Sequence, residues 1–292
     1  MRNAPYAKSD QAEGLRRLCG RQSRQLVSVA AATSGAGRTA FILHVAVALA
    51  TLGRRVLIID ENKGLGNVND VLGLGLRYDL AHAIAGDRDM REICRPALVG
   101  IKLLPAAQVA RDPALVEGPR CSELLAAAAA DADVVLVDTA AASAGRRWPL
   151  HGEHSHLVMV PAGAEAVTAA YGFIKQHAQN VWHPPLGIVV SRVASVAQGE
   201  AIHANLSDVA KRFLARPLPL AGVWGSDLAV PLALRARQTV NATDVEHAVS
   251  RRCADIANQL IGGAPNVAPS LPVPWLARLL RAAPSSTAWS AT

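Results

Sequence analysis

Short runs of valine, isoleucine and leucine alternate with longer helix-like runs along most of this chain of 292 residues. The apolar runs show no polar alternation, which is typical of strands buried on both faces of a parallel sheet. Strands that alternate with helices form a doubly wound α/β fold, in which helices flank a mostly parallel sheet. We predict strands at 26–31, 56–59, 101–104, 134–137, 157–160, 187–190 and 222–224, and helices at 39–52, 79–85, 122–130, 165–178, 200–214 and 243–260.

The composition divides the chain into three parts. Residues 1–24 are polar and basic and are predicted to be a flexible N-terminal segment, residues 25–262 form the folded domain, and residues 263–292 are a tail rich in proline and alanine. Apolar residues make up 51% of the chain, which excludes disorder throughout, and the aromatic share of 4% predicts an aliphatic core.

The chain is basic, with a formal net charge of +7 and a pI of about 9.7. This charge favours acidic partners such as nucleic acid, anionic lipid or an acidic protein surface, although a basic surface also serves solubility alone. The basic residues form scattered pairs rather than one block. Both interpretations therefore stay open, and DNA is the less favoured partner.

The four cysteines, Cys19, Cys94, Cys121 and Cys253, form no C-x-x-C pair. We interpret them as free thiols in a reducing compartment. The N-terminal residues lack the apolar run of a secretory signal, so we expect a cytoplasmic protein.

Three histidines, His151, His154 and His156, lie close together in the sequence. Their spacing fits no common zinc pattern, and no cysteine is near them. We therefore interpret them as part of a surface loop rather than as a metal site.

A glycine-rich turn follows the first predicted strand and opens the first predicted helix, which is the context that a phosphate-binding loop requires. The P-loop pattern is G-x-x-x-x-G-K-[ST], and here Ala32 replaces the first glycine and Arg38 the lysine. Backbone N–H groups of such a turn can bind phosphate without specific side chains, but a guanidinium replaces a slim ammonium poorly. The alternative is a turn that caps a helix and binds nothing. The candidate nucleotide-binding residues of the turn are Ser34, Gly35, Ala36, Gly37, Arg38 and Thr39.

Two further apolar runs end in aspartate, namely Asp60 and Asp138. The carboxyl ends of parallel strands are where α/β folds bind ligands. Asp138 is similar to a Walker-B acid, which would orient Mg²⁺ together with the hydroxyl of Thr39. We predict that Asp60, Asn67 and Asp138 join the turn in a nucleotide site. Each aspartate alone could equally cap the loop that follows it.

Residues 60–74 read D-E-N-K-G-L-G-N-V-N-D-V-L-G-L. This stretch resembles the D-A-D-x-G-L-x-N-V-D-x-x-L-G-L signature of the MinD/ParA-type deviant-Walker ATPases. More narrowly, it resembles their FlhG-like (also called FleN-like) branch, which regulates flagellar number and placement. The resemblance covers roughly residues 9–260. It implies a P-loop fold of the MinD/ParA type that binds ATP or ADP with Mg²⁺ and forms homodimers.

Residues 10–16 match, without a substitution, the D-Q-A-x-x-L-R motif of FlhG-like proteins. The resemblance implies that this segment forms a helix on a FlhF-like GTPase and stimulates GTP hydrolysis. Gln11 is the residue type that positions an attacking water in other GTPases, so it would act in trans on the partner. Gly14 weakens an isolated helix by about 1 kcal/mol, so we expect the segment to fold on its partner. The partner-binding candidates are Asp10, Gln11, Ala12, Leu15 and Arg16.

Four positions depart from the resembled pattern. The signature lysine aligns with Thr33, the P-loop lysine with Arg38, the second aspartate of D-x-D with Asn62, and the adenine-recognising asparagine with Ser191. Positioning and charge supply nearly all of the catalysis at such sites, so we expect ATP hydrolysis to be lost or very slow. Asp60 is then the remaining catalytic candidate of the site.

Two alternatives stay open beside a flagellar regulator. One is an active ATPase switch that dimerises on ATP and cycles on the membrane, with Arg38 and Asp60 replacing the missing groups. The other is a ParA-like DNA-binding partition protein. For the regulator, the resemblance also implies contacts with flagellar switch-complex proteins or a flagellar transcription regulator.

The tail contains a short amphipathic segment. On a helical wheel, one face carries Trp275, Leu276, Leu279 and Leu280, with arginines opposite. This pattern is typical of an interfacial membrane helix, but it also suits packing on the protein's own body. The segment is too short for strong binding unless the protein dimerises. We expect at most a peripheral location at the inner face of the cytoplasmic membrane, at the cell pole.

Overall fold

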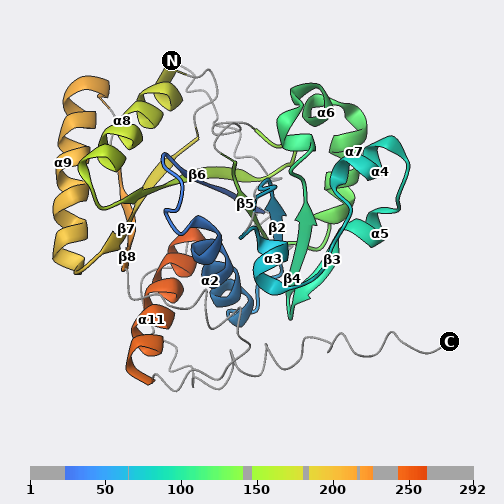
Figure 1. The fold of residues 1–292 in the computed structure, drawn as a ribbon, viewed down its shortest axis with the longest axis horizontal. Helices are drawn as coiled ribbons and strands as arrows, with labels where there is room; N and C mark the ends of the chain where they lie inside the picture. Colours follow the sequence, from blue (N-terminus) through green and yellow to red (C-terminus); the bar gives the residue numbers. More distant parts are fainter. Residues whose placement is uncertain are drawn as a thin grey trace, which may run out of the picture.

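The computed structural model describes residues 24–64, 66–140, 147–179, 184–215, 218–225 and 243–261. They form a sheet covered by helices on both faces (Figure 1). The strands are β1 (Gln25–Ala31), β2 (Val56–Asp60), β3 (Arg95–Leu98), β4 (Ile101–Pro105), β5 (Val134–Asp138), β6 (Glu153–Pro161), β7 (Leu186–Val193) and β8 (Leu220–Gly225). The helices are α2 (Arg38–Thr51), α3 (Val68–Leu72), α4 (Leu80–Ala85), α5 (Met90–Ile93), α6 (Pro113–Glu117), α7 (Pro119–Ala128), α8 (Ala164–Gln179), α9 (Val196–Leu214) and α11 (Thr243–Leu260), and η1 (Val109–Arg111) is a 3₁₀ turn.

The sheet is doubly wound, as predicted from the sequence. Its strand order is β3-β4-β2-β5-β1-β6-β7-β8, and each neighbouring pair is parallel except β3 with β4. The chain leaves β1 toward β2 on one side, and later crosses β1 on its way from β5 to β6. The carboxyl end of β1 is therefore a switch point of the topology, which is where open α/β sheets bind ligands.

The edge strand β3 was not predicted. It has only four residues, two of them exposed, and it contains Pro96. Proline cannot donate to a strand ladder and is tolerated at sheet edges. Because β3 lacks the buried apolar run of the other strands, its sequence carries little strand signal.

Side chains of successive strand residues point to opposite faces of the sheet. Ile58 packs in the cluster that contains residues of α2 and α11, whereas Ile59 packs in the cluster that contains residues of α4 and α7. A third cluster joins β6 and β7 to α8 and α9. Figure 1 shows α2 and α11 next to each other in front of the sheet. The strands are therefore buried on both sides, which explains their unbroken apolar runs.

Side-chain caps fix helix starts that the sequence analysis missed. Helix α9 begins at Val196 rather than near residue 200, because the Ser195 hydroxyl accepts the N–H of Gln198. The short helix α3 begins after Asn67, whose side-chain oxygen accepts the N–H of Asp70 at 2.8 Å. Such caps satisfy N–H groups that the helix itself leaves without partners.

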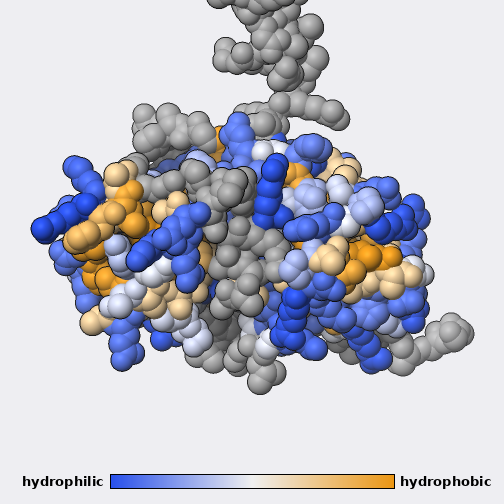
Figure 2. Space-filling model, turned by 90° about the horizontal axis from the view of Figure 1, so that it is seen from above, coloured by the Kyte–Doolittle hydropathy of each residue, from blue (hydrophilic) through white to orange (hydrophobic). Residues whose placement is uncertain are grey.

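The face of the molecule seen in Figure 2 is mostly hydrophilic in its described part. Figure 2 shows apolar side chains gathered in separate areas rather than on one continuous face. The exposed large apolar residues are Val99, Val196, Val209 and Phe213, three of them on α9. Among the helices of the described ranges, none is both long and apolar enough to cross a membrane.

The histidine interpretation is wrong for two of the three residues. His154 and His156 belong to β6 rather than to a surface loop, and His156 is buried with its ring 5.2 Å from that of His177. The strand starts earlier than predicted because its first residues are polar, which hides them from an apolar-run criterion. His151 is exposed, as expected.

The thiols behave as predicted within the described ranges. Cys94, Cys121 and Cys253 are free, and Cys19 lies outside these ranges. Burial raises the pKa of the Cys121 thiol to about 11 and that of Cys253 to about 12, so both are inert at neutral pH.

Gly199 fixes the distance between α9 and β8. A Cβ at this position would lie 2.5 Å from Cγ1 of Val223, so we expect Gly199→Ala to lower the free energy of unfolding by about 1–3 kcal/mol through overpacking. The matched control is Gly172→Ala in α8, where a Cβ would meet nothing within 4 Å. There we expect a gain of about 1 kcal/mol from helix propensity. Urea denaturation measures both, and equal effects would contradict the close packing.

Candidate functional site

The glycine turn connects the end of β1 to the start of α2. Gly35 and Gly37 have φ values of +72° and +86°, a left-handed backbone that glycine adopts without strain. Gly37 is the N-cap of α2, and no side chain caps the first N–H groups of this helix. Free N–H groups at the positive end of a helix dipole favour an anion, so the turn is suited to bind phosphate.

A cavity of about 530 Å³ opens on the turn. Its walls come from the turn, from the segment after β2 and from the end of β7, and comprise Ala31, Ala32, Thr33, Ser34, Gly35, Ala36, Gly37, Arg38, Thr39, Ala40, Asn62, Gly64, Gly66, Asn67, Val71 and Arg192. The structure thus brings the predicted turn residues and Asn67 to one cavity. Asp60 and Asp138 do not line it.

The two aspartates lie beside the cavity, in the sheet. Asp60 and Asp138 are register partners at the carboxyl ends of β2 and β5, with exposed fractions of 3% and 0%. Buried carboxylates at this spacing repel each other unless a cation or hydrogen-bond donors compensate.

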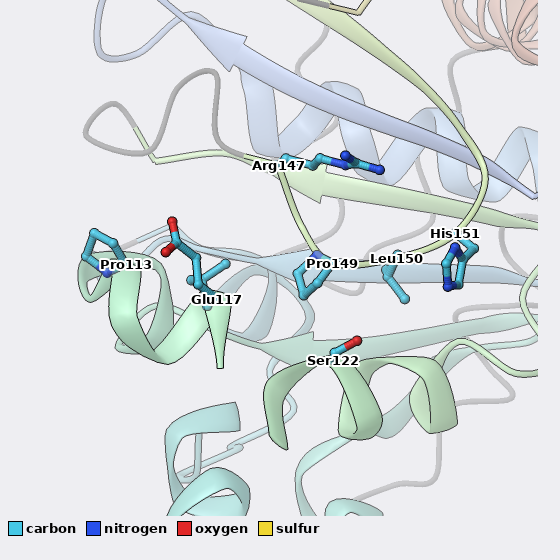
Figure 3. A pocket seen from close by; sticks show the side chains of 8 residues that line it. Pro113, Glu117, Ser122, Arg147, Pro149, Leu150 and His151 are labelled. Carbon is cyan, nitrogen blue, oxygen red and sulfur yellow. The ribbon is translucent and has the colours of Figure 1, made fainter. Parts of the chain in front are cut away.

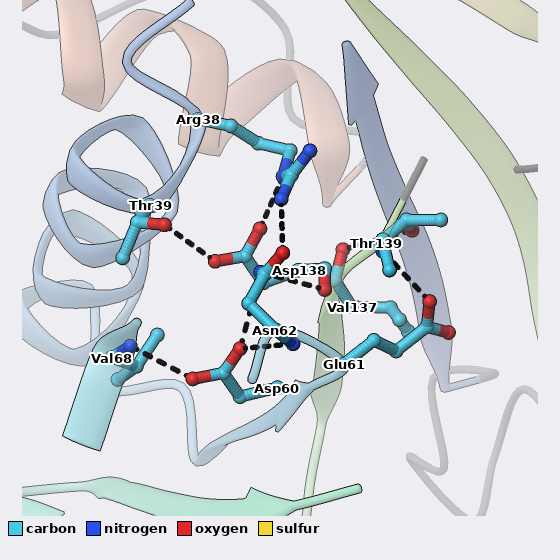
Figure 4. A network of polar contacts seen from close by, with 10 residues as sticks. Arg38, Thr39, Asp60, Glu61, Asn62, Val68, Val137, Asp138 and Thr139 are labelled. Atoms are coloured by element: carbon cyan, nitrogen blue, oxygen red, sulfur yellow. Dashed lines mark hydrogen bonds and ion pairs between the residues drawn. The ribbon is translucent and has the colours of Figure 1, made fainter. Parts of the chain in front are cut away.

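Arg38 provides this compensation. Its Nε donates to Oδ1 of Asp138, and its guanidinium also donates to Oδ1 of Asn62 at 2.6 Å (Figure 4). The Thr39 hydroxyl donates to Oδ2 of Asp138 at 2.7 Å. Both oxygens of Asp138 are therefore satisfied within the protein, and the charge of Arg38 is directed at the acid rather than at the turn.

Asp60 is held by three donors. Its Oδ1 accepts the backbone N–H of Asn62 at 3.0 Å and its side-chain amide at 3.2 Å, and its Oδ2 accepts the N–H of Val68 at 2.8 Å (Figure 4). Burial, together with the charge of Asp138, nevertheless raises the pKa of Asp60 to about 7. Asp60 therefore positions the segment between β2 and α3 and titrates near neutral pH.

The residue types that would bind Mg²⁺ are present but engaged. Hydroxyl and carboxylate oxygens are ligands that Mg²⁺ prefers, and Thr39 and Asp138 supply them. In the structure these two groups bind each other, and Asp138 also binds Arg38. Throughout the described ranges, no group of three or more His, Cys, Asp or Glu residues could hold a metal. The Thr39 hydroxyl keeps its lone pairs for a metal while it donates to Asp138, whereas direct binding of Mg²⁺ to Asp138 would displace one of the contacts of this carboxylate.

Sequence reasoning missed the role of Glu61. This buried carboxylate accepts the Trp148 indole N–H at 2.8 Å and the Ala140 N–H at 2.9 Å. It ties the end of β2 to the segments that follow β5. No spacing in the sequence connects Glu61 with Trp148, because the pair is formed only by the fold.

Sequence reasoning also missed Arg192, which lines the cavity from the end of β7. Beside it, Ser191 is 0% exposed, and its hydroxyl has no hydrogen-bond partner among the described residues. The signal of Arg192 in the sequence was its place directly after Ser191, the position that aligns with the adenine-recognising asparagine of the resembled family.

The other predicted site residues lie outside the described ranges. These are the candidates Asp10, Gln11, Ala12, Leu15 and Arg16 of the N-terminal motif, and Trp275, Leu276, Leu279 and Leu280 of the tail.

A second cavity of about 560 Å³ is separate from the glycine turn (Figure 3). It is formed by α6, α7 and the segment before β6, with Arg147, His151, Glu117 and Ser122 among its polar residues. It contains no residue predicted for a site. Its lining mixes both charges, which indicates no particular ligand.

No protein-family model matches the chain. The antiactivator FleN of Pseudomonas aeruginosa is 28% identical over 220 residues, which are 74% of this chain and 79% of FleN. The flagellum site-determining protein YlxH of Helicobacter pylori is 23% identical over 195 residues, 65% of this chain and 66% of YlxH. The septum site-determining protein MinD of Bacillus subtilis is 25% identical over 82% of this chain and 89% of that protein.

Solved structures show the same fold. The MinD cell division protein of Aquifex aeolicus has a TM-score of 0.63 at 17% identity, over 84% of this chain and 99% of that one. The MinD of Pyrococcus horikoshii, complexed with Mg-ADP, has a TM-score of 0.58 at 19% identity, over 81% and 96%. The sheet order, the glycine turn after β1 and the strand-terminal acids define a P-loop NTPase fold of the MinD/ParA type.

The relatives found by sequence indicate which branch of the MinD/ParA family this chain resembles. The similarity to FleN and YlxH supports a FlhG/FleN-like protein of the MinD/ParA family, in agreement with the prediction from residues 60–74.

Proposed function

We propose that this protein regulates the number and placement of flagella. The observation that supports this most is the similarity to the antiactivator FleN, which extends over 220 residues and thus over most of the folded domain. The similarity to YlxH, a flagellum site-determining protein, points to the same process. Flagellar switch-complex proteins or a flagellar transcription regulator are the further partners we propose, together with homodimer formation.

In this proposal the N-terminal motif acts on a FlhF-like GTPase. Residues 10–16 would fold into a helix on the GTPase, and Gln11 would position the water that attacks GTP. The GTPase supplies the phosphate chemistry and this chain supplies the helix. The folded domain then serves as a carrier that brings the motif to its place of action.

The domain itself is proposed to bind ATP or ADP, with Mg²⁺, but to hydrolyse ATP very slowly or not at all. The glycine turn and the uncapped start of α2 support phosphate binding. The engagement of Arg38 with Asp138 argues against fast turnover, because the positive charge of Arg38 is directed at this acid rather than at a nucleotide. MinD of Pyrococcus horikoshii binds Mg-ADP on the same fold.

Replacing Gln11 should abolish the action on the GTPase. We expect the full-length chain to accelerate GTP hydrolysis by the FlhF-like GTPase of the same cell, and Gln11→Ala to lower that acceleration by about tenfold or more. Gln22→Ala, an equal change outside the motif, is the matched control. The measurement is steady-state phosphate release from GTP. Equal stimulation by both variants, or none by the wild type, would remove this role.

The alternative is an active ATPase switch, and a specific observation bears on it. Asp60 has a raised pKa near 7, a value that suits proton transfer at neutral pH. Steady-state phosphate release from ATP, at high protein concentration with lipid vesicles, distinguishes the two. Turnover that disappears in Asp60→Ala would favour the switch over a nearly inactive site. Salt-sensitive DNA retardation would instead favour the less favoured partition protein.

A further inference from the structure

Arg192 is placed by an irregularity at the end of β7. The strand pairs with β8 through Ser191 and Trp224 and again through Val193 and Gly225, with a shift of register between them. Arg192 lies at this shift and has a φ of +57°, the left-handed region that non-glycine residues rarely adopt. A bulge of this kind redirects a side chain, and such irregularities occur next to functional sites.

The redirected side chain reaches the glycine turn. An Nη atom of Arg192 lies 3.3 Å from the position that a Cβ of Gly35 would occupy, so the guanidinium lies directly against the turn. Arg192 lines the same cavity as the turn. Two segments far apart in the sequence thus meet at this point: the turn after β1 and the end of β7.

The guanidinium of Arg192 has no protein partner within the described part of the chain. Neither a hydrogen bond nor an ion pair connects it to any described residue. Arg38 is the opposite case, since its guanidinium binds Asp138 and Asn62. Of the two arginines that line the cavity, Arg192 is therefore the one with donors left for a ligand.

We propose that Arg192 is the cationic phosphate ligand of this site, binding the di- or triphosphate of a nucleotide at the glycine turn. The inference rests on the proposed nucleotide binding and adds which residue provides the charge. A guanidinium presents several donors in a fixed plane and binds phosphate through paired hydrogen bonds. Arg192 comes from the same chain as the turn. It therefore provides a positive charge that Thr33 cannot, without any contribution from a second subunit.

Gly35 leaves the space that the Arg192 guanidinium occupies beside the turn. A side chain at Gly35 would contact the guanidinium and would strain a turn whose φ is +72°. The absence of a Cβ leaves the guanidinium and the N–H groups of the turn facing the same space. Both kinds of donor can then bind one phosphate group.

Calorimetric titration with ADP and with ATP tests the proposal on the full-length protein. We expect Arg192→Gly to weaken binding by about 10- to 100-fold, the effect of losing hydrogen bonds to a charged group. Arg192→Lys keeps the charge and should lose less. Arg95→Ala, on the far edge strand β3, removes the same charge elsewhere and should bind like the wild type.

Thermal unfolding separates binding from folding. Glycine adopts a φ of +57° without strain, so Arg192→Gly should melt no lower than the wild type while it loses affinity. Wild-type binding that Arg192→Gly leaves unchanged would overturn the role of Arg192 and leave the proposed nucleotide binding intact. Absence of wild-type binding to both ADP and ATP would overturn the nucleotide binding itself, and the role of Arg192 with it. Sedimentation of the ADP complex as a monomer would support a ligand supplied within one chain.

Discussion

Replacing Arg38 with alanine is expected to lower the free energy of unfolding by about 3–5 kcal/mol, the cost of removing one partner from a buried ion pair. Asp138 is 0% exposed and accepts the Nε–H of Arg38, and Asp60 lies at the register position beside it. Without the guanidinium, two buried carboxylates remain with only neutral donors. Chemical denaturation at pH 8, above the Asp60 pKa of about 7, measures the loss.

Two further variants identify the cause of this loss. Combining Arg38→Ala with Asp138→Asn removes the buried charge together with its partner, so we expect a large part of the stability to return. Arg38→Lys keeps a positive charge but cannot bridge Asp138 and Asn62 at once, and should fall between the wild type and Arg38→Ala. A double variant as unstable as Arg38→Ala would show that Arg38 acts through packing rather than through charge.

The stability of the fold should depend on pH through Asp60. Its pKa is raised from 3.8 to about 7 in the folded protein, chiefly by burial and then by Asp138. Between these two values the folded state keeps a proton that the unfolded state has lost, so the free energy of unfolding falls as the pH rises. The stabilising contribution of Asp60 is therefore full below about pH 4. It decreases as the pH rises and is gone above about pH 7. The full change is at most about 4 kcal/mol, at 1.36 kcal/mol for each pKa unit.

Asp60→Asn removes this dependence and serves as the comparison. Asparagine cannot ionise, so the free energy of unfolding of the variant should increase relative to that of the wild type as the pH rises from 4 to 7. The free energy of unfolding of the variant must be subtracted from that of the wild type at each pH, because other groups titrate in the same range. Burial lowers the pKa of His44 and of His156 to about 4. These histidines make the fold less stable as the pH falls, which opposes the trend from Asp60. A constant difference between wild type and Asp60→Asn across this range would mean that Asp60 stays ionised.

The parallel sheet and the glycine turn could be predicted because their signals are local. An unbroken apolar run such as 56–59 indicates a buried strand, and the turn at 33–39 carries its own pattern. Strand β3 and the first residues of β6 gave no such signal, since they are polar or contain proline. The class of fold therefore followed from the sequence, whereas the sheet edges did not.

The interior of the site could be predicted only in part. The sequence indicated that Arg38 weakens a P-loop, but not that its guanidinium lies on Asp138, because that contact joins residues 100 positions apart. Arg192 likewise reaches Gly35 only through the register shift between β7 and β8. Side-chain direction after a bulge depends on the backbone of two strands, and no pattern in either segment alone encodes it.

The orientation of β1 has a consequence for how the two ends of this domain can work together. The glycine turn follows Ala31, while the N-terminal segment joins the strand before Gln25, at the opposite rim of the sheet. A strand of this length separates the two rims by about 20 Å, at roughly 3.3 Å per residue. In the proposed function, the leading segment therefore holds its partner from an anchor at the rim opposite the cavity, and the cavity can fill or empty without any change at that anchor.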